Sequence, residues 1–242
     1  MRLMSEAFYT IPARCDAPVF IFGDHASKHI PAQFNGLGLM GDDLTRHIAW
    51  DIGTETLIQA LCAHFGCAGH VASFSRLVID ANRDPQAAGL IPLESDGTII
   101  PGNAMLSNEA RMERVKTYYA PYHDGLAVAL DGLAPQTLVI SVHSFTPKPL
   151  TGEARQTDIG LLVKHDEASA LRFQDCVKRL RPDFTVDINL PYSAYDLNYT
   201  IDHHVASHGF PHLAIEVRQD HVDTDDKARA VADMLAKAIA SL

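Results

Sequence analysis

The sequence contains no hydrophobic run long enough to cross a membrane. None of its apolar stretches approaches the roughly 18 consecutive apolar residues that a transmembrane helix requires. The first residues, Met1 to Glu6, also lack the apolar segment of a secretory signal peptide. We therefore expect a cytoplasmic protein with no membrane partner.

Cysteine is scarce as well. The chain has four cysteines, which form no CxxC pair and show no spacing typical of a zinc knuckle: Cys15, Cys62, Cys67 and Cys176. Isolated cysteines of this kind are typically free thiols in a reducing cytoplasm. The sequence thus argues against a fold that depends on disulfides.

Clusters of positive charge are also missing. The chain has 20 Lys and Arg against 30 Asp and Glu, which gives a net charge of −10 with His neutral. Binding to a nucleic-acid backbone depends on clustered cations, so we expect no nucleic-acid partner. A small anionic substrate stays possible, because a few arginines fixed in a cleft can outweigh a surface charge that salt screens within about 10 Å. The candidates are Arg76, Arg83, Arg155 and Arg218.

Repeats, low-complexity segments and a Pro/Gly/Ser-rich linker are absent, so we expect residues 1–242 to form a single catalytic domain. A Gly-rich phosphate-binding loop is absent too. A serine nucleophile at Ser144 is disfavoured because the chain has no Gly-x-Ser-x-Gly elbow.

Three apolar runs, by contrast, each end next to a metal-binding or acid–base residue. The run 18–22 precedes Asp24 and His25, the run 137–142 precedes His143, and the run 212–215 precedes Glu216. Short continuous apolar runs are typical of strands buried on both faces, and ligands bind beyond the carboxyl ends of parallel strands. Two histidines and a carboxylate should therefore meet in one cleft.

The segments between these runs alternate between strand-like and helix-like patterns. We expect a helix from Asp42 or Asp43 to Phe65, a long irregular loop over 84–103, and a helix capped by Ser107 that continues to Leu133 with a break near Pro121. Further strands are expected at 70–74 and 159–163, and further helices at 167–180 and 224–242. The order of the strands in the sheet cannot be derived from these patterns.

Two histidines and a carboxylate are the ligand set of a catalytic zinc site, where the metal activates water and polarises a carbonyl. A separate carboxylate is then needed as general base, and Glu216 suits that role. The alternative for Glu216 is a salt bridge to Arg218, its neighbour on the same face of the strand.

Nine short motifs, taken in order, resemble the N-formylglutamate amidohydrolase family over about residues 18–222. They are Asp24–Ser27, Arg46–Gly53, Ser75–Arg83, Ser95–Gly97, Ile100–Asn103, Pro121–His123, Val142–Pro147, Pro191–Ser193 and Ile215–Asp220. Asp80–Arg83, His143 and Ile215–Val217 are more distantly similar to parts of the zinc carboxypeptidase and aspartoacylase group. That second resemblance implies an α/β fold, a three-layer α/β/α sandwich around a mostly parallel mixed sheet.

The resemblance also implies roles for individual residues. His25 and His143 match the two histidine ligands of one Zn²⁺, and Glu216 matches the general base. Asn82 and Arg83 match the pair that orients the substrate and polarises its carbonyl.

One position departs from the carboxypeptidase pattern, which has a Glu ligand three residues after the first histidine. That position is Lys28 here, and a cation cannot bind the metal. We expect Asp51 to be the third ligand, with Asp24 and His47 as alternatives.

The remaining candidates are side chains that could contact substrate or support the ligands. Arg76 and Arg218 could each bind a substrate carboxylate in bidentate geometry, although Arg76 could equally pair with Asp80. Ser144 is expected to contact the substrate and His123 to hold a ligand in place. A polar loop adds three weaker candidates, Tyr199, His203 and His204.

Together these features predict a metal-dependent hydrolase of an acidic N-acyl amino acid. The family's reaction converts N-formyl-L-glutamate to formate and L-glutamate in histidine breakdown. The alternatives are a related zinc amidase or carboxypeptidase-like hydrolase with another N-acyl or peptide substrate, and a metal-binding relative without catalytic activity. Other divalent metals also suit a His/carboxylate site.

Overall fold

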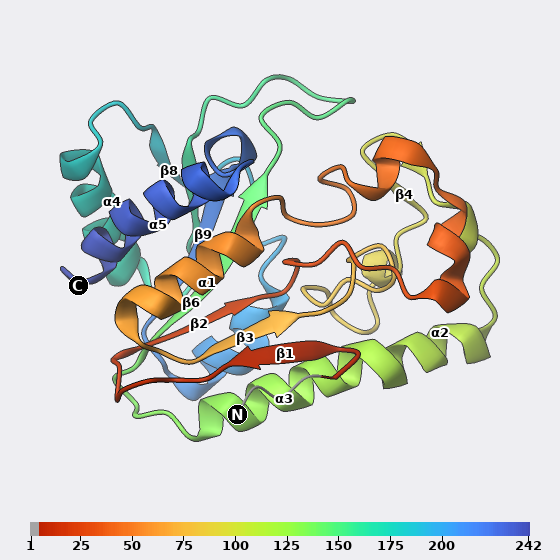
Figure 1. The fold of residues 1–242 in the computed structure, drawn as a ribbon, viewed down its shortest axis with the longest axis horizontal. Helices are drawn as coiled ribbons and strands as arrows, with labels where there is room; N and C mark the ends of the chain where they lie inside the picture. The colour runs from red at the N-terminus through yellow and green to blue at the C-terminus, as the bar shows by residue number, and fades with distance from the viewer. Residues whose placement is uncertain (1–4) are drawn as a thin grey trace.

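Seven strands form one central sheet in the computed structural model, which describes residues 5–242 (Figure 1). Their order in the sheet is β1-β3-β2-β6-β9-β7-β8. The strands are β1 (Phe8–Ile11), β2 (Val19–Gly23), β3 (Gly69–Ala72), β6 (Leu138–Phe145), β7 (Ile159–Leu162), β8 (Val186–Ile188) and β9 (His212–Arg218). The four strands β3, β2, β6 and β9 run parallel, whereas β1 and β7 pair antiparallel to their neighbours β3 and β9.

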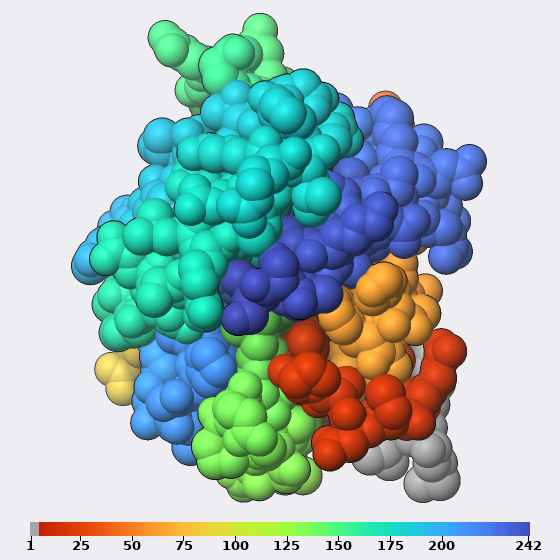
Figure 2. Space-filling model, turned by 90° about the vertical axis from the view of Figure 1, so that its left-hand side faces the viewer, coloured from red at the N-terminus to blue at the C-terminus, as the bar shows by residue number. Residues whose placement is uncertain are grey.

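Helices cover both faces of this sheet (Figure 1). On one face lie α1 (Thr54–Phe65), α4 (Glu167–Leu180) and α5 (Asp225–Ile239), and α5 packs between α1 and α4 (Figure 2). On the other face, α2 (Asn108–Arg114) continues through a π-helical turn (Val115–Tyr119) into α3 (Ala120–Asp131). The predicted three-layer α/β/α sandwich with a mostly parallel mixed sheet is confirmed.

The central strands are buried on both faces because each face packs on a helical layer. Ile21 and Ile140 contribute to the core beneath α1, α4 and α5, whereas Phe20, Phe22 and Val139 pack with Leu126 of α3 and neighbouring residues. Every residue of β2 and β6 is buried. This arrangement explains why these strands appear in the sequence as continuous apolar runs.

Several predicted elements are confirmed near their expected boundaries. The amide of Ala110 donates to Oγ of Ser107 at 3.2 Å, so Ser107 caps α2 as expected. The helix does not break at Pro121, because the π-helical turn Val115–Tyr119 lies where the amide that proline lacks would otherwise bond. Helix α4 begins at Glu167 and α5 begins after the capping residue Thr224.

The helix predicted from Asp42 or Asp43 to Phe65 is wrong in its first half. A short 3₁₀ helix occupies Gly41–Leu44, and α1 begins only at Thr54. The backbone leaves helical geometry because the amide of Asp51 donates to the carbonyl of His25 at 2.9 Å, and Gly53 has a φ of 81°. The segment before α1 is thus held against the end of β2.

The strands that carry His143 and Glu216 extend further than their apolar runs. His143 lies inside β6 and Glu216 inside β9, rather than in the loops that follow. The edge strands β1 and β8 were not predicted. The long loop over 84–103 contains a small hairpin of β4 (Glu94–Ser95) and β5 (Thr98–Ile99) and two short 3₁₀ turns.

Gly53 is the residue at which a side chain would disturb this fold most directly. A Cβ atom there would overlap the carbonyl oxygen of Val222, and the positive φ is unfavourable for any L-residue. We expect Gly53→Ala to lower the free energy of unfolding by about 3 kcal/mol. Urea denaturation measures this change.

Gly41 is the matched control for that substitution. It also has a positive φ, of 60°, but no atom lies within 4 Å of a Cβ built there. Gly41→Ala should therefore cost only the backbone strain, about 1 kcal/mol. Equal losses in the two variants would contradict the steric argument for Gly53.

Within residues 5–242, no helix is both long and apolar enough to cross a membrane. All four cysteines are free, and only Cys15 is exposed.

Candidate active site

The predicted site residues meet at the carboxyl ends of the parallel strands. His143 of β6 and Glu216 of β9 are direct neighbours in the sheet register, and β2 leads straight into Asp24 and His25. These strand ends open into a cavity of about 240 Å³. Of the residues predicted first for catalysis, metal binding and substrate contact, all but Arg218 line this cavity, whereas His123 and the loop candidates Tyr199, His203 and His204 do not.

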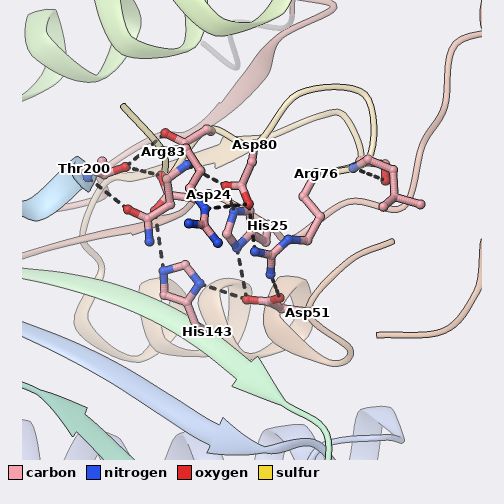
Figure 3. A network of polar contacts seen from close by, with 12 residues as sticks. Asp24, His25, Asp51, Arg76, Asp80, Arg83, His143 and Thr200 are labelled. Carbon is pink, nitrogen blue, oxygen red and sulfur yellow. Dashed lines mark hydrogen bonds and ion pairs between the residues drawn. The ribbon is translucent and has the colours of Figure 1, made fainter. Parts of the chain in front are cut away.

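His25, Asp51 and His143 form a buried cluster inside this cavity (Figure 3). One ligand atom from each lies within 4.8 Å of the others. His143 Nδ1 is 2.8 Å from Asp51 Oδ2, and His25 Nδ1 is 3.5 Å from the same oxygen. The structure therefore brings together the two predicted histidines and the predicted third ligand.

The opposite nitrogen of each histidine ring is held by another side chain. His25 Nε2 lies 2.7 Å from Asp80 Oδ1, and His143 Nε2 lies 3.0 Å from Ser141 Oγ and 3.5 Å from Asp24 Oδ2. Such partners fix the ring orientation and the tautomer of a metal-binding histidine. Both Nδ1 atoms are thereby directed toward Asp51.

The carboxylates of the cluster change the protonation of its histidines. Burial and the positive charge of Arg76 act to lower the pKa of His25, but Asp80 and Asp51 outweigh them and hold that pKa above its usual value. The pKa of His143 is also raised, since hydrogen bonds to Asp24 and Asp51 overcome the effect of burial. The same pairing holds the pKa of Asp51 well below its usual range despite burial. The carboxylates around the two rings thus favour positive charge at this place.

The cluster fits a divalent cation. His25 Nδ1 is buried and makes no hydrogen bond, although it faces Asp51. An unpaired buried nitrogen is costly, and ligation to a metal would satisfy it. Imidazole nitrogens with one carboxylate are also the donor set of open catalytic zinc sites.

The two alternative third ligands lie elsewhere. Asp24 accepts hydrogen bonds from Tyr122 at 2.7 Å and from Thr200 at 3.0 Å, on the far side of His143 from Asp51. His47 Nε2 pairs with Asp96 at 3.2 Å near the mouth of the cavity. Neither belongs to the cluster of potential ligands, so the geometry favours Asp51.

Glu216 lies beside this cluster with an unsatisfied carboxylate. Its Oε2 atom is buried and has no hydrogen-bond partner within residues 5–242. Burial raises the pKa of Glu216 to about 7, against the lowering effect of the neighbouring His143. A carboxylate with this pKa can both accept and return a proton near neutral pH.

The expected contact of Arg218 with substrate is not supported by its position. Its guanidinium pairs with Asp158 at 2.9 Å and with Asp220 at 2.8 Å, outside the cavity. Arg218 is the last residue of β9, and neither of its two carboxylate partners belongs to the cavity lining. The alternative salt bridge between Glu216 and Arg218 is therefore also absent among the described residues.

The other candidates for substrate binding line the cavity, and they differ in how strongly partners in the protein already hold them. Arg76 pairs with Asp80 at 2.8 Å, the alternative that the sequence allowed for it, and also with Asp51 at 3.4 Å. Arg83 is 37% exposed, and its Nε lies 3.8 Å from Asp80. Asn82 accepts a hydrogen bond from the amide of Thr200 at 3.0 Å.

Ser144 uses its hydroxyl within the protein. Its Oγ donates to the carbonyl of Ile52 at 2.7 Å, which ties β6 to the segment that carries Asp51. The backbone amide of Ser144 also points to Asp51 Oδ2, at 3.4 Å. Ser144 thus lines the cavity and also holds the segment that carries Asp51 against β6.

The structure reveals supporting residues that the sequence did not single out. The sequence indicated Asp80 only as a partner for Arg76, and it gave no role to Ser141. Their signal was present in the sequence: Asp80 follows the run 77–79, and Ser141 interrupts the apolar stretch of β6 before His143. His123 was expected to hold a ligand but instead bonds Ala81 and His204.

Three buried histidines behind the site make stability depend on pH. Burial lowers the pKa of His70, His123 and His204 to about 4, against about 6.5 in an unfolded chain. At these three sites the unfolded chain therefore binds more protons between these values, so the stability that the three histidines contribute is fully present above about pH 6.5 and is lost as the pH falls toward 4. Each histidine contributes up to about 1.4 kcal/mol per pH unit in this window.

Urea denaturation at about pH 7.5 and about pH 5 tests this dependence. His70→Gln should reduce the difference between the two free energies of unfolding, since one titrating group is removed. His64→Gln alters an exposed histidine on α1 and should leave the difference unchanged. An unchanged difference in the His70 variant would contradict the assignment.

Two solved structures are similar to this chain over nearly its whole length. A gene product of Agrobacterium tumefaciens is similar to the chain with 30% identity and a TM-score of 0.86, covering 97% of this chain and 95% of that one. An N-formylglutamate amidohydrolase from Ralstonia eutropha has 20% identity and a TM-score of 0.68, with 98% and 97% covered. A search of the curated proteins gave no match.

The family comparison is the finding that assigns the chain to a family. The model of the N-formylglutamate amidohydrolases matches residues 17–222, a range that includes every residue of the cluster as well as Glu216. With this match over most of its length, the chain belongs to the N-formylglutamate amidohydrolase family, a family of amidohydrolases.

Proposed function

We propose that this amidohydrolase is zinc-dependent and cleaves N-formyl-L-glutamate to formate and L-glutamate. The observation that carries the proposal is the unsatisfied Glu216 carboxylate beside the His25, Asp51 and His143 cluster. A site with only a binding role would have no use for a buried carboxylate that is held near its point of titration. The family match supports the formyl-amino-acid substrate.

His25, Asp51 and His143 would hold the zinc ion, with Asp80 and Ser141 fixing the two rings. When bound, the ion supplies Lewis-acid chemistry: it lowers the pKa of a water molecule and polarises a carbonyl. The histidines must give up their extra protons for this binding, so metal affinity should fall as the pH is lowered.

Glu216 carries the proton transfers in the proposed reaction. Its carboxylate takes a proton from the attacking water and then delivers that proton to the nitrogen of the departing amino acid. Arg83 reaches the same cavity with a half-exposed guanidinium and stabilises the negative charge that develops on the carbonyl oxygen. Asn82, whose side chain is fixed by Thr200, orients the substrate.

A panel of N-acyl amino acids tests the proposed substrate. We expect formate release from N-formyl-L-glutamate to exceed that from N-formyl-L-aspartate, and acetate release from N-acetyl-L-glutamate to be lower still. Faster turnover of the acetyl substrate would indicate a related amidase with another acyl specificity. Full metal occupancy without turnover of any substrate would indicate a metal-binding relative without catalytic activity.

A further inference from the structure

Three arginines line the cavity, and they differ in how far carboxylates of the protein neutralise them. Arg76 is paired with two aspartates, and Arg83 lies near one of them. Arg155 forms no ion pair with any carboxylate in residues 5–242; its hydrogen bonds go to the carbonyl of Thr146 at 3.2 Å and to the hydroxyl of Tyr192 at 3.0 Å. One positive charge in the cavity thus has no negative partner in the protein.

The surroundings of Arg155 hold its guanidinium in one place. Its charged group lies 4.7 Å from the ring centre of Tyr192 and 5.6 Å from that of Phe145. Its backbone amide donates to the carbonyl of Pro147 at 2.7 Å, which closes the base of the loop that follows β6. A guanidinium fixed by stacking and by neutral acceptors keeps its other N–H groups available for a carboxylate.

The wall beside Arg155 is apolar. Phe145, Tyr192 and Leu197 line the same cavity as Arg155 and Glu216. A ligand group that passes along these side chains to the guanidinium would have methylenes that end in a carboxylate. The side chain of glutamate has this composition, whereas an α-carboxylate is joined directly to the carbon that bears the scissile amide.

We propose that Arg155 is the residue that selects an acidic side chain, by binding the side-chain carboxylate of the N-acyl amino acid, with Tyr192 as its positioning residue. The assignment rests on the proposed function, since it concerns the substrate of the same site. Arg83 and Asn82 remain beside the scissile amide. The two arginines enter the cavity from different segments, Arg83 from the loop after β3 and Arg155 from the loop after β6.

Three formyl substrates distinguish the role of the side-chain carboxylate from that of the α-carboxylate. N-formyl-L-glutamate carries both, N-formyl-L-glutamine lacks the side-chain carboxylate, and the α-amide of N-formyl-L-glutamate lacks the α-carboxylate. Formate release gives kcat/KM for each with zinc-loaded wild-type protein and Arg155→Met. We expect the variant to lose about 10²-fold or more on N-formyl-L-glutamate and on the α-amide, but less than about threefold on N-formyl-L-glutamine.

Two further variants and one control test whether the loss comes from the guanidinium of Arg155. Arg155→Lys keeps the charge but not the planar fork, so it should recover part of the loss on the two substrates with a side-chain carboxylate. Tyr192→Phe removes the hydroxyl that holds Arg155 and should raise KM for the same two substrates; it also carries the test if the methionine variant does not fold. Arg172→Met makes the same charge change on the exposed face of α4 and serves as the control.

An equal loss on all three substrates in Arg155→Met would show a structural role only and would overturn the assignment. A loss on N-formyl-L-glutamine that spares the α-amide would place the α-carboxylate at Arg155 and would also overturn it. In both cases wild-type turnover leaves the proposed function standing. Formate release from none of the three substrates by the wild-type protein would overturn the proposed function and the assignment together.

Discussion

Replacing Glu216 by Gln should lower kcat of formate release by about 10²-fold or more while the metal stays bound. The amide has nearly the shape of the carboxylate but cannot accept a proton from water, so the contribution of general-base catalysis is lost. Glu216 is not part of the ligand cluster, and the cavity around it should remain intact. The measurement combines steady-state kinetics with metal analysis of the same sample.

The control for this variant is Glu113→Gln, which makes the same chemical change on the exposed surface of α2. It should leave both kcat and the metal content at wild-type values. Turnover of the Glu216 variant within a few-fold of wild type, with full metal occupancy, would show that Glu216 is not the base. Loss of the metal from that variant would instead place Glu216 among the ligands.

Replacing Asp51 by Ala should remove the metal. Asp51 Oδ2 is the atom shared by both histidines, and the substitution leaves only two nitrogen donors in the cluster. We expect metal affinity to fall by more than the roughly 10- to 100-fold that is typical when only a supporting side chain is lost. Competition with a chelator measures the affinity, and formate release should fall in parallel.

His47→Ala is the matched comparison, because His47 was the alternative ligand and lies in the same cavity. Its partner is Asp96 rather than the cluster, so its removal should leave metal affinity within a few-fold of wild type. Full metal retention by the Asp51 variant and loss from the His47 variant would reverse the assignment. Circular dichroism of both proteins shows whether the fold survives.

The two histidines and Glu216 could be found from the sequence because each follows or ends a buried strand. A continuous apolar run marks such a strand, and parallel strands place their carboxyl ends at one edge of the sheet. The same argument explains why an α/β fold was predictable, whereas the three-layer architecture came from the family resemblance. The strand order was not, since no pairing in the sheet is encoded in the hydrophobicity of a single strand.

The segment around Asp51 shows where the spacing of apolar residues fails to predict the local structure. The segment before α1 carries apolar residues at helical spacing, yet the amide of Asp51 bonds to His25 and Gly53 adopts a positive φ. Contacts with the end of β2 override the local preference, as is common at functional sites. Its choice as a ligand came from the family resemblance and not from the spacing.

Arg218 shows a second limit of prediction from the sequence, which does not reveal ion-pair partners that are distant along the chain. Its position two residues after Glu216 on one strand predicts a side chain on the same face, facing the substrate. Asp220 is close to Arg218 in sequence, but Asp158 is distant from it, and only the fold brings Asp158 to the guanidinium. The role of Asp80 as the partner of His25 was missed for the same reason, because the two residues belong to different loops.

The most direct test of the account is a zinc titration of the metal-free protein with N-formyl-L-glutamate as substrate. We predict that formate release is negligible without metal, rises with each addition of Zn²⁺, and saturates at one equivalent per chain. L-Glutamate should appear in equal amount, since hydrolysis of the amide produces both. Formate release at the full rate from metal-free protein that contains an excess of chelator would contradict the account.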